Sequence, residues 1–245
     1  MKRFYKVVEC EAVEGGYQIS LDSRPVRTPM KSLLIVPERA LADAVVQEWR
    51  DQGEEIEPVS MPLTGLLNVA IDYVEPRRSE VVADLASYAE SELLCYRADE
   101  QEELCSLQDE RWQPLLDWAD DTLSIGLSIT HGVLPISQPA GVKKTVGAIV
   151  ERMAPLALTG LLKLVPALGS IVLGLAMFHG RISAEAAYDL SVLEDVWQEG
   201  QWGPDSEAIE RRSKVKADVV NAERLLRLGR ALESVCDESW RDSVT

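Results

Sequence analysis

The chain has 245 residues, of which 46% are hydrophobic and 27% are charged, values typical of a globular protein with a substantial core. This length suits one large domain or two modest ones. Twenty-five lysines and arginines stand against 41 aspartates and glutamates, a net charge of −16. Because affinity for a nucleic-acid backbone comes from basic side chains, this charge argues against a nucleic-acid partner and favours a partner that carries positive charge.

The cysteines and the N-terminus predict a reducing compartment. Cys10, Cys95, Cys105 and Cys236 form no C-x-x-C pair, and Met1 leads within three residues into an apolar, strand-like segment rather than a secretory signal. We therefore expect reduced thiols in the cytoplasm of a bacterium, or in the mitochondrial matrix if the chain is a trimmed organellar form.

Residues 1–76 predict a small β-rich domain with short helices. Tyr17, Ile19 and Leu21 alternate with polar residues, the period of a half-buried strand. Residues 33–36 predict a buried strand, and residues 54–58 a returning one. Between them, a helix is predicted from an apolar stripe of Leu41, Val45 and Trp49, with Trp49 in the core. Pro62 is placed to open a second short helix.

Residues 77–245 predict a larger, all-helical domain. Apolar residues recur at helical spacing around residues 82–93 and 104–123, and helices are expected at about 140–152, 156–164, 167–179, 183–200 and 206–234. In the last of these, Gly229 either allows close approach of another helix or weakens the final turns. The predicted fold class is therefore α+β, with a small N-terminal β-rich domain followed by a larger helical domain.

The most apolar stretch, residues 156–178, is long enough to be mistaken for a membrane span. Lys163 and Pro166 interrupt it, so we expect two short core helices joined at residues 164–166. A partner-binding groove and insertion into a membrane surface are the alternatives for this stretch.

A search for catalytic chemistry predicts no catalytic residue, no metal site and no cofactor. The two histidines, His131 and His179, belong to no zinc-spaced cluster, and phosphate-loop and nucleophile-elbow motifs are absent. His179 suits a helix C-terminus. A Cys/His-type hydrolase that uses Cys95 and His131 is the alternative function, although Cys95 borders an apolar stripe and suits a buried position.

Residues 191–203 are the most informative segment, because they combine carboxylates with two tryptophans. Glu194 borders an apolar stripe that is predicted to be buried, one turn after Leu190. This stripe consists of Ala186, Leu190, Leu193 and Trp197. A carboxylate beside such a stripe tends to have a specific partner, in this chain or in another. Trp197 is either a core residue or an interface residue.

Several segments together resemble an ATP synthase assembly chaperone family that acts on the alpha subunit of the catalytic head. The resemblance runs in the same order along most of the chain. It includes residues 3–6, 16–29, 61–64 and 92–98, and then Leu193-Glu194, Trp197-Gln198 and Trp202-Gly203.

The resemblance implies a chaperone rather than an enzyme. Such a protein would bind the unassembled ATP synthase alpha subunit and shield its beta-facing interface until beta displaces it, without membrane insertion and as a monomer. The client-binding residues that we expect on this basis are Glu194, Trp197, Gln198, Trp202 and Gly203.

Overall fold

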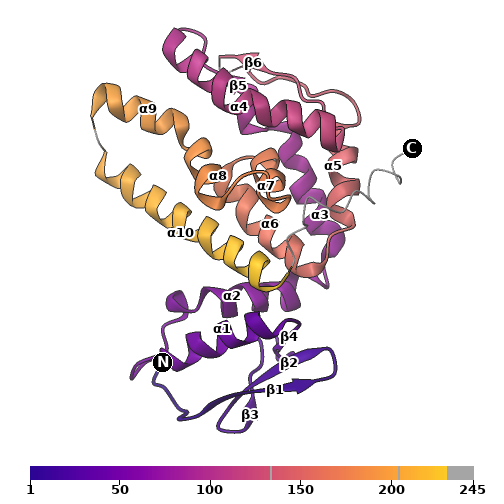
Figure 1. Cartoon of the computed structure of the whole chain (residues 1–245), viewed down its shortest axis with the longest axis vertical. Coiled ribbons are helices and arrows are strands. Elements are labelled where there is room, and N and C mark those ends of the chain that lie inside the picture. The colour runs from indigo at the N-terminus through magenta and orange to yellow at the C-terminus, as the bar shows by residue number, and fades with distance from the viewer. Residues whose placement is uncertain (133, 204, 231–245) are drawn as a thin grey trace. The chain divides into compact units, whose positions relative to one another are not determined.

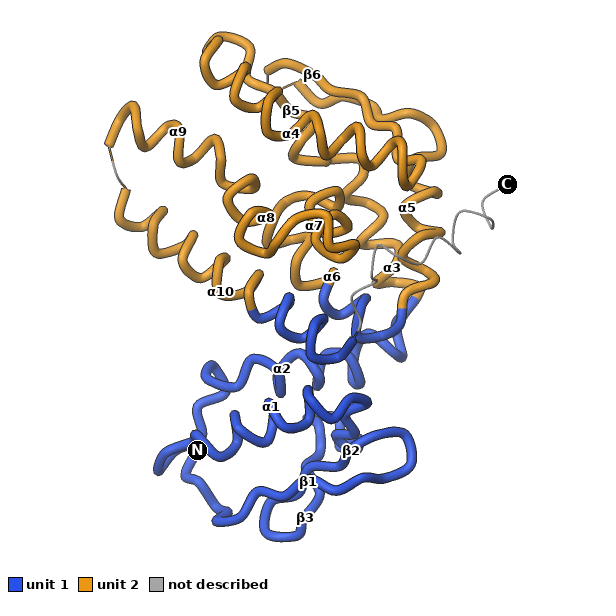
Figure 2. Tube along the Cα trace, in the orientation of Figure 1, with its two compact units in different colours: residues 1–78, 154–160, 221–232 blue, residues 79–153, 161–220, 233–245 orange. Residues whose placement is uncertain are grey.

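The computed structural model describes residues 1–132, 134–203 and 205–230. Among these, the chain forms two compact units (Figure 2): unit 1 contains residues 1–78, 154–160 and 221–230, and unit 2 contains residues 79–153 and 161–220. The strands β1 to β4 gather near the N-terminus and helices dominate the rest (Figure 1), so the predicted α+β class is confirmed. The domain boundary after residue 76 stays a prediction.

Unit 1 is built on a four-stranded antiparallel sheet. Its central strand β2 (Gly16–Leu21) pairs with β1 (Val8–Val13), β3 (Arg24–Pro25) and β4 (Ile35–Val36). Ile19 and Leu21 are buried, as their alternation predicts. The turn between β2 and β3 places Asp22 and Ser23 at φ 48° and 65°, a conformation that costs non-glycine residues energy. The Asp22 carboxylate offsets part of this cost by accepting hydrogen bonds from the N–H groups of residues 6 and 7.

Two helices contact one another in the same unit. α1 (Arg39–Arg50) packs on β1 and β2, with Leu41 and Val45 buried as predicted and Trp49 half-buried against the core. α2 (Pro62–Val69) lies between the 3-10 turn η1 (Pro58–Ser60) and the π-helical turn η2 (Ala70–Val74). The buried Glu48 carboxylate of α1 accepts hydrogen bonds from the N–H groups of Leu63 and Thr64 at 2.8 and 2.9 Å, and so caps α2.

One predicted strand of unit 1 is shorter than expected, and another does not form. β4 covers only Ile35–Val36, because Leu33 forms a single bridge with Arg27 and is 37% exposed. Residues 54–58 form no strand; Glu55 makes one bridge with Lys2 before Pro58 begins η1. Proline has no N–H for a strand ladder, so this segment turns into a helix instead.

Glycines let two distant segments approach closely in unit 1. A Cβ on Gly160 in α6 (Pro155–Leu168) would lie 2.5 Å from Leu226 Cδ2 in α10 (Ser206–Leu228). A Cβ on Gly229 would lie 2.9 Å from Leu156 Cδ1. Of the two roles considered for Gly229, close helix approach is therefore the one that the structure shows.

Unit 2 is a helical assembly around α7 (Ile171–Phe178), whose eight residues are all buried. The long α4 (Glu102–Leu123) and α8 (Ala184–Ser191) both contact α7. Unit 2 also contains α3 (Arg78–Ser87), α5 (Val142–Glu151), α9 (Leu193–Trp202), residues 161–168 of α6 and residues 206–220 of α10, with the 3-10 turns η3 (Tyr88–Glu90) and η4 (Leu93–Cys95). Two short strands, β5 (Tyr96–Arg97) and β6 (Thr130–His131), pair in parallel.

The apolar stretch 156–178 forms two helices, as predicted, but the predicted joint at residues 164–166 is wrong. α6 continues through Pro166 to Leu168, and the chain breaks at Gly169, which has φ 65°. Ser170 then caps α7 by accepting a hydrogen bond from the N–H of Leu173. A glycine able to adopt positive φ, followed by a capping serine, sets this boundary more strongly than proline does. Among the described residues, no helix combines the length and apolarity needed to cross a membrane.

The single helix predicted over residues 183–200 is also wrong, because two helices occupy this segment. α8 ends at Ser191, and α9 begins at Leu193 after Val192, which has φ −108° and ψ 13°. The indole Nε1 of Trp112 in α4 donates a hydrogen bond to the Leu190 carbonyl at 3.0 Å. A carbonyl in the last turn of α8 is thereby satisfied without further helix.

A buried carboxylate organises the N-terminus of α7. Glu92 is fully buried and accepts hydrogen bonds from the N–H groups of Leu94, Ile171 and Val172. Burial raises the pKa of Glu92 from 4.5 to about 7, although these hydrogen bonds and one from Ser170 act in the opposite direction. Between these pKa values the folded chain binds more protons at Glu92 than the unfolded chain, so this group makes folding more favourable as pH falls from 7 to 4.5.

We predict that Glu92→Gln flattens the dependence of the unfolding free energy on pH. Relative to the variant, the parent should gain stability on the order of 3 kcal/mol between about pH 8 and about pH 4. Urea denaturation across this range measures the difference, with the exposed Glu103→Gln as the control. Parallel curves for the parent and Glu92→Gln would contradict the raised pKa.

Candidate protein-binding groove

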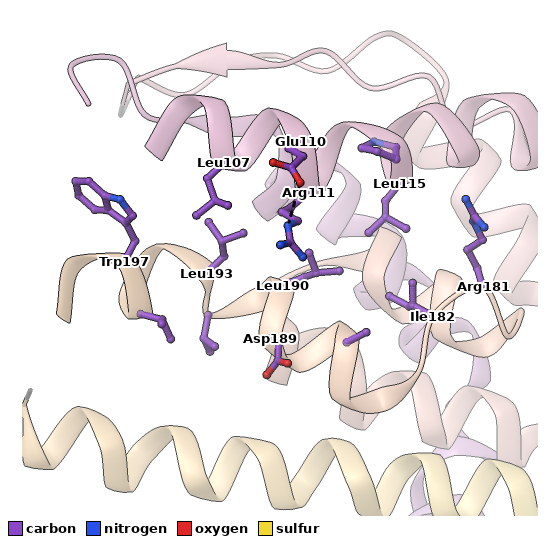
Figure 3. A pocket seen from close by; sticks show the side chains of 14 residues that line it. Leu107, Glu110, Arg111, Leu115, Arg181, Ile182, Asp189, Leu190, Leu193 and Trp197 are labelled. Atoms are coloured by element: carbon purple, nitrogen blue, oxygen red, sulfur yellow. Dashed lines mark ion pairs between the residues drawn. The ribbon is translucent and has the colours of Figure 1, made fainter. Parts of the chain in front are cut away.

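A groove of about 690 Å³ runs in unit 2 between α4 on one side and α8 and α9 on the other (Figure 3). Ten of its fourteen lining residues are apolar, which makes it a binding surface for apolar groups. The lining residues are Leu107, Glu110, Arg111, Pro114, Leu115, Arg181, Ile182, Ala186, Asp189, Leu190, Val192, Leu193, Val196 and Trp197.

The α4 wall is fixed by a buried tryptophan of the same helix. Trp112 is 1% exposed and donates its indole hydrogen bond to the Leu190 carbonyl. Leu107 and Leu115 lie on the groove side, and Leu107 points toward Leu193 across the gap (Figure 3). The sequence prediction assigned Leu115 to an apolar stripe but missed Leu107; its spacing of four residues to Arg111 and eight to Leu115 places the three near one face of a helix.

The α9 wall is unusual because none of its ten residues is buried. Leu193, Val196 and Trp197 line the groove, and Val196 is 54% exposed. The prediction that Ala186, Leu190, Leu193 and Trp197 form a buried stripe is therefore wrong: all four are only half-buried and line the groove. The helical spacing identified their common face correctly. It could not show that α4 leaves open space in front of that face.

The structure brings the five predicted client-binding residues together along α9 and its end. Trp197 lines the groove, and the Trp202 ring meets it edge to face at 6.4 Å and 89°. Trp202 is 73% exposed, and Gly203 ends the helix at φ 94°. The exposed Glu194 accepts a hydrogen bond from Gln198 Nε2 at 3.0 Å, one turn along the helix. Their role as client contacts stays a prediction.

Polar contacts hold α9 and α8 against the first half of α10. Glu199 of α9 forms an ion pair with Arg212 of α10, and both side chains are largely shielded from solvent. This hydrogen-bonded carboxylate raises the pKa of the Arg212 guanidinium. Lys216 lies 3.4 Å from Glu185 and 5.3 Å from the ring centroid of Tyr188 in α8. These contacts orient α9 while its apolar side remains available.

The helices that form the groove carry twelve of the chain's 41 acidic residues and only one basic residue. α4 contains seven acidic residues and one basic residue, Arg111, whereas α8 and α9 together contain five acidic residues and no basic one. Arg111 pairs with the adjacent Glu110 at 3.7 Å, within the groove lining. This concentration of like charge produces a local field that attracts cationic groups.

The geometry does not favour the alternative hydrolase. Cys95 is buried, and burial raises the pKa of its thiol to about 12, the opposite of what a nucleophilic cysteine requires. His131 Nδ1 lies 3.0 Å from the Ala98 carbonyl oxygen and 3.7 Å from Cys105 Sγ. Neither Cys95 nor His131 lines the groove. In the part of the chain that the structure describes, no group of three or more His, Cys, Asp or Glu residues is arranged to hold a metal ion.

Comparisons with known proteins identify relatives of the whole chain. The model of the ATP12 chaperone protein family matches residues 2–120. The mitochondrial protein atp12 of Schizosaccharomyces pombe is 24% identical over 250 residues, which is 97% of this chain and 85% of the relative. The crystal structure of Atp12 from Paracoccus denitrificans is 42% identical, with a TM-score of 0.89 over 94% of this chain and 98% of that one.

The chain belongs to the ATP12 family of ATP synthase assembly chaperones.

A third relative is also similar over most of the chain. The crystal structure of Atu1473 from Agrobacterium tumefaciens is 38% identical, with a TM-score of 0.86 over 95% of this chain and 86% of that one. The family model ends inside α4, whereas the α8–α9 wall of the groove follows it in the chain. The likeness to these two crystal structures, in contrast, covers nearly the whole chain, with helices of both walls within the length compared.

We predict that two tryptophans of this ATP12-family chain differ sharply in their contribution to stability. Trp112→Ala should lower the unfolding free energy by about 3–5 kcal/mol, because it empties a core site and removes a hydrogen bond. Trp202→Ala should change it by less than about 0.5 kcal/mol, since the side chain is mostly in solvent. Guanidinium denaturation compares the two variants with the parent. A large loss for Trp202→Ala would place that side chain in the core.

Proposed function

We propose that this ATP12-family chaperone binds the unassembled alpha subunit of ATP synthase through α9 and shields the alpha surface that meets beta. The observation that carries the proposal is α9 itself: a helix with no buried residue that presents apolar side chains and two tryptophans whose rings meet edge to face. Tryptophans at such positions often supply much of the binding energy of protein interfaces. Family membership supplies ATP synthase assembly as the setting.

The physical need for such a chaperone follows from subunit assembly. An alpha subunit without its beta neighbour would expose a large apolar interface and aggregate. A chaperone that covers this surface by ordinary noncovalent contacts can be displaced when beta competes for it. The acidic helices around the groove would speed encounter with a client surface that carries basic side chains.

The proposed function requires no catalytic step from this chain. Ten of the fourteen groove-lining residues are apolar, and the buried Cys95 thiol is poorly suited to act as a nucleophile. We propose that the chain acts as a monomer, in the bacterial cytoplasm or the mitochondrial matrix. The two settings correspond to its relatives, the mitochondrial protein of S. pombe and the protein of P. denitrificans.

Co-expression with the alpha subunit tests this function. The parent chain should keep alpha soluble and co-purify with it, and added beta should release the chaperone. Glu194→Lys should abolish this rescue while leaving helicity unchanged, because Glu194 is exposed and its replacement repels a basic client group. Soluble alpha and circular dichroism are the two measurements.

The exposed Glu14→Lys in the turn between β1 and β2 is the matched control, since it makes the same charge change far along the chain from α9. It should rescue alpha as well as the parent does. A folded Glu194→Lys chain with undiminished rescue would remove Glu194 from the interface. A parent chain that fails to retain alpha under any condition would overturn the proposed function.

A further inference from the structure

We propose that the groove between α4 and α9 binds a basic amphipathic helix of the client, with the apolar face of that helix inserted between Leu107 and Leu193. This inference rests on the proposed function, which makes an ATP synthase subunit the client. It goes further by naming the groove as the point of contact and a helix with lysine or arginine on its flanks as the chemistry that the groove recognises.

The dimensions of the groove suit two turns of helix. On α4 its lining runs from Leu107 to Leu115, a separation of eight residue steps that spans about 12 Å at 1.5 Å per residue. An amphipathic helix that anchors through positions i, i+3 or i+4, and i+7 spans about 10 Å. The apolar side chains of α4 and α9 face one another across this length, as Leu107 and Leu193 show in Figure 3.

The chemistry of the lining favours a helix over other ligands. Its four charged residues include the mutually paired Glu110 and Arg111, so a small polar ligand would meet few free hydrogen-bonding groups there. An extended peptide gains affinity by pairing its backbone with the edge of a sheet, whereas both walls of this groove are helices. A helix satisfies its own backbone and offers only side chains, which is what an apolar groove between helices can bind.

Charge selects a basic helix. The lining itself is balanced, since Glu110 and Asp189 lie there with Arg111 and Arg181, but the three helices α4, α8 and α9 together carry twelve carboxylates and one arginine, which pairs with Glu110. Glu194 and Gln198 form a hydrogen-bonded pair on α9 beside the groove, where a lysine or arginine on the flank of the bound helix could reach the carboxylate. An acidic helix would face repulsion from both walls.

The α9 wall can adjust to the bound helix at little cost in core packing. It contributes no buried residue, and its ion pair with α10 joins Glu199 to Arg212, neither of which lines the groove. Displacing α9 outward would therefore expose less apolar surface than moving α7, whose residues are all buried.

Peptide binding to the full chain tests the groove directly. The probe is a fluorescein-labelled helical peptide of about two heptads with leucines at i, i+3, i+4 and i+7 and lysines on its flanks. Two control peptides have the same composition in scrambled order, and glutamate in place of lysine. Fluorescence anisotropy should show binding of the basic amphipathic peptide at least about tenfold tighter than either control, weakening as salt is added.

A matched pair of variants localises the binding. Val196→Lys changes a groove residue that is 54% exposed, and Val220→Lys makes the same change at a 44% exposed position of α10 that lies outside the groove lining. We expect Val196→Lys to weaken peptide binding at least about tenfold and Val220→Lys to leave it unchanged, with both variants folded by circular dichroism. Equal affinity for the scrambled or acidic peptide, or unchanged binding by Val196→Lys, would overturn the proposal.

Two further measurements separate this inference from the proposed function. A parent chain and a Val196→Lys chain that retain alpha equally well would overturn the groove as the contact and leave the function standing. A parent chain that binds the basic peptide through Val196 but never retains alpha would overturn the function. Sedimentation of the parent as a dimer that Val196→Lys disrupts would assign the groove to a second copy of this chain, and would also overturn the proposal.

Discussion

The contact of Trp112 with the end of α8 is the constraint on which the groove of unit 2 depends. This buried side chain fills the interior side of α4, and its indole donates to the Leu190 carbonyl. The hydrogen bond satisfies a terminal carbonyl of α8, where the chain changes direction at Val192 and begins α9. Because α9 starts on a new axis, its apolar side chains face α4 across open space rather than entering the core. The groove is thus a consequence of how one helix ends.

Electrostatics and exposed apolar surface act together at this place. A half-exposed apolar groove on an isolated protein would ordinarily promote aggregation, but dense acidic charge on α4, α8 and α9 keeps such a surface soluble and disfavours self-association. The same charge would attract the basic client proposed above. A chaperone for subunit assembly needs both properties, since it must expose an adhesive surface without aggregating and must release its client to a competitor.

The sequence predicted the fold class because its patterns are strong: period-two alternation in β2, the α1 stripe of Leu41 and Val45, and the apolar stretch that becomes α6 and α7. It failed where local signals compete. Pro166 predicted the end of a helix that in fact ends before Gly169 and Ser170. The helical spacing of apolar residues continues across Val192, so it did not indicate that one helix ends there and another begins. For the site, the sequence identified the residues of α9 as candidates, but it placed the apolar stripe that contains Trp197 in the core. Only the position of α4 decides whether a helix face is covered, and that information is tertiary.

Hydrogen–deuterium exchange of the chain with and without purified alpha subunit tests the central claim most directly, because exchange reports protection segment by segment. If α9 (Leu193–Trp202) and the groove side of α4 form the client surface, their amides should exchange more slowly in the complex. The buried α7 should remain unchanged and serve as the internal reference. A stable complex with alpha in which α9 exchanges as it does in the free chain would contradict the account.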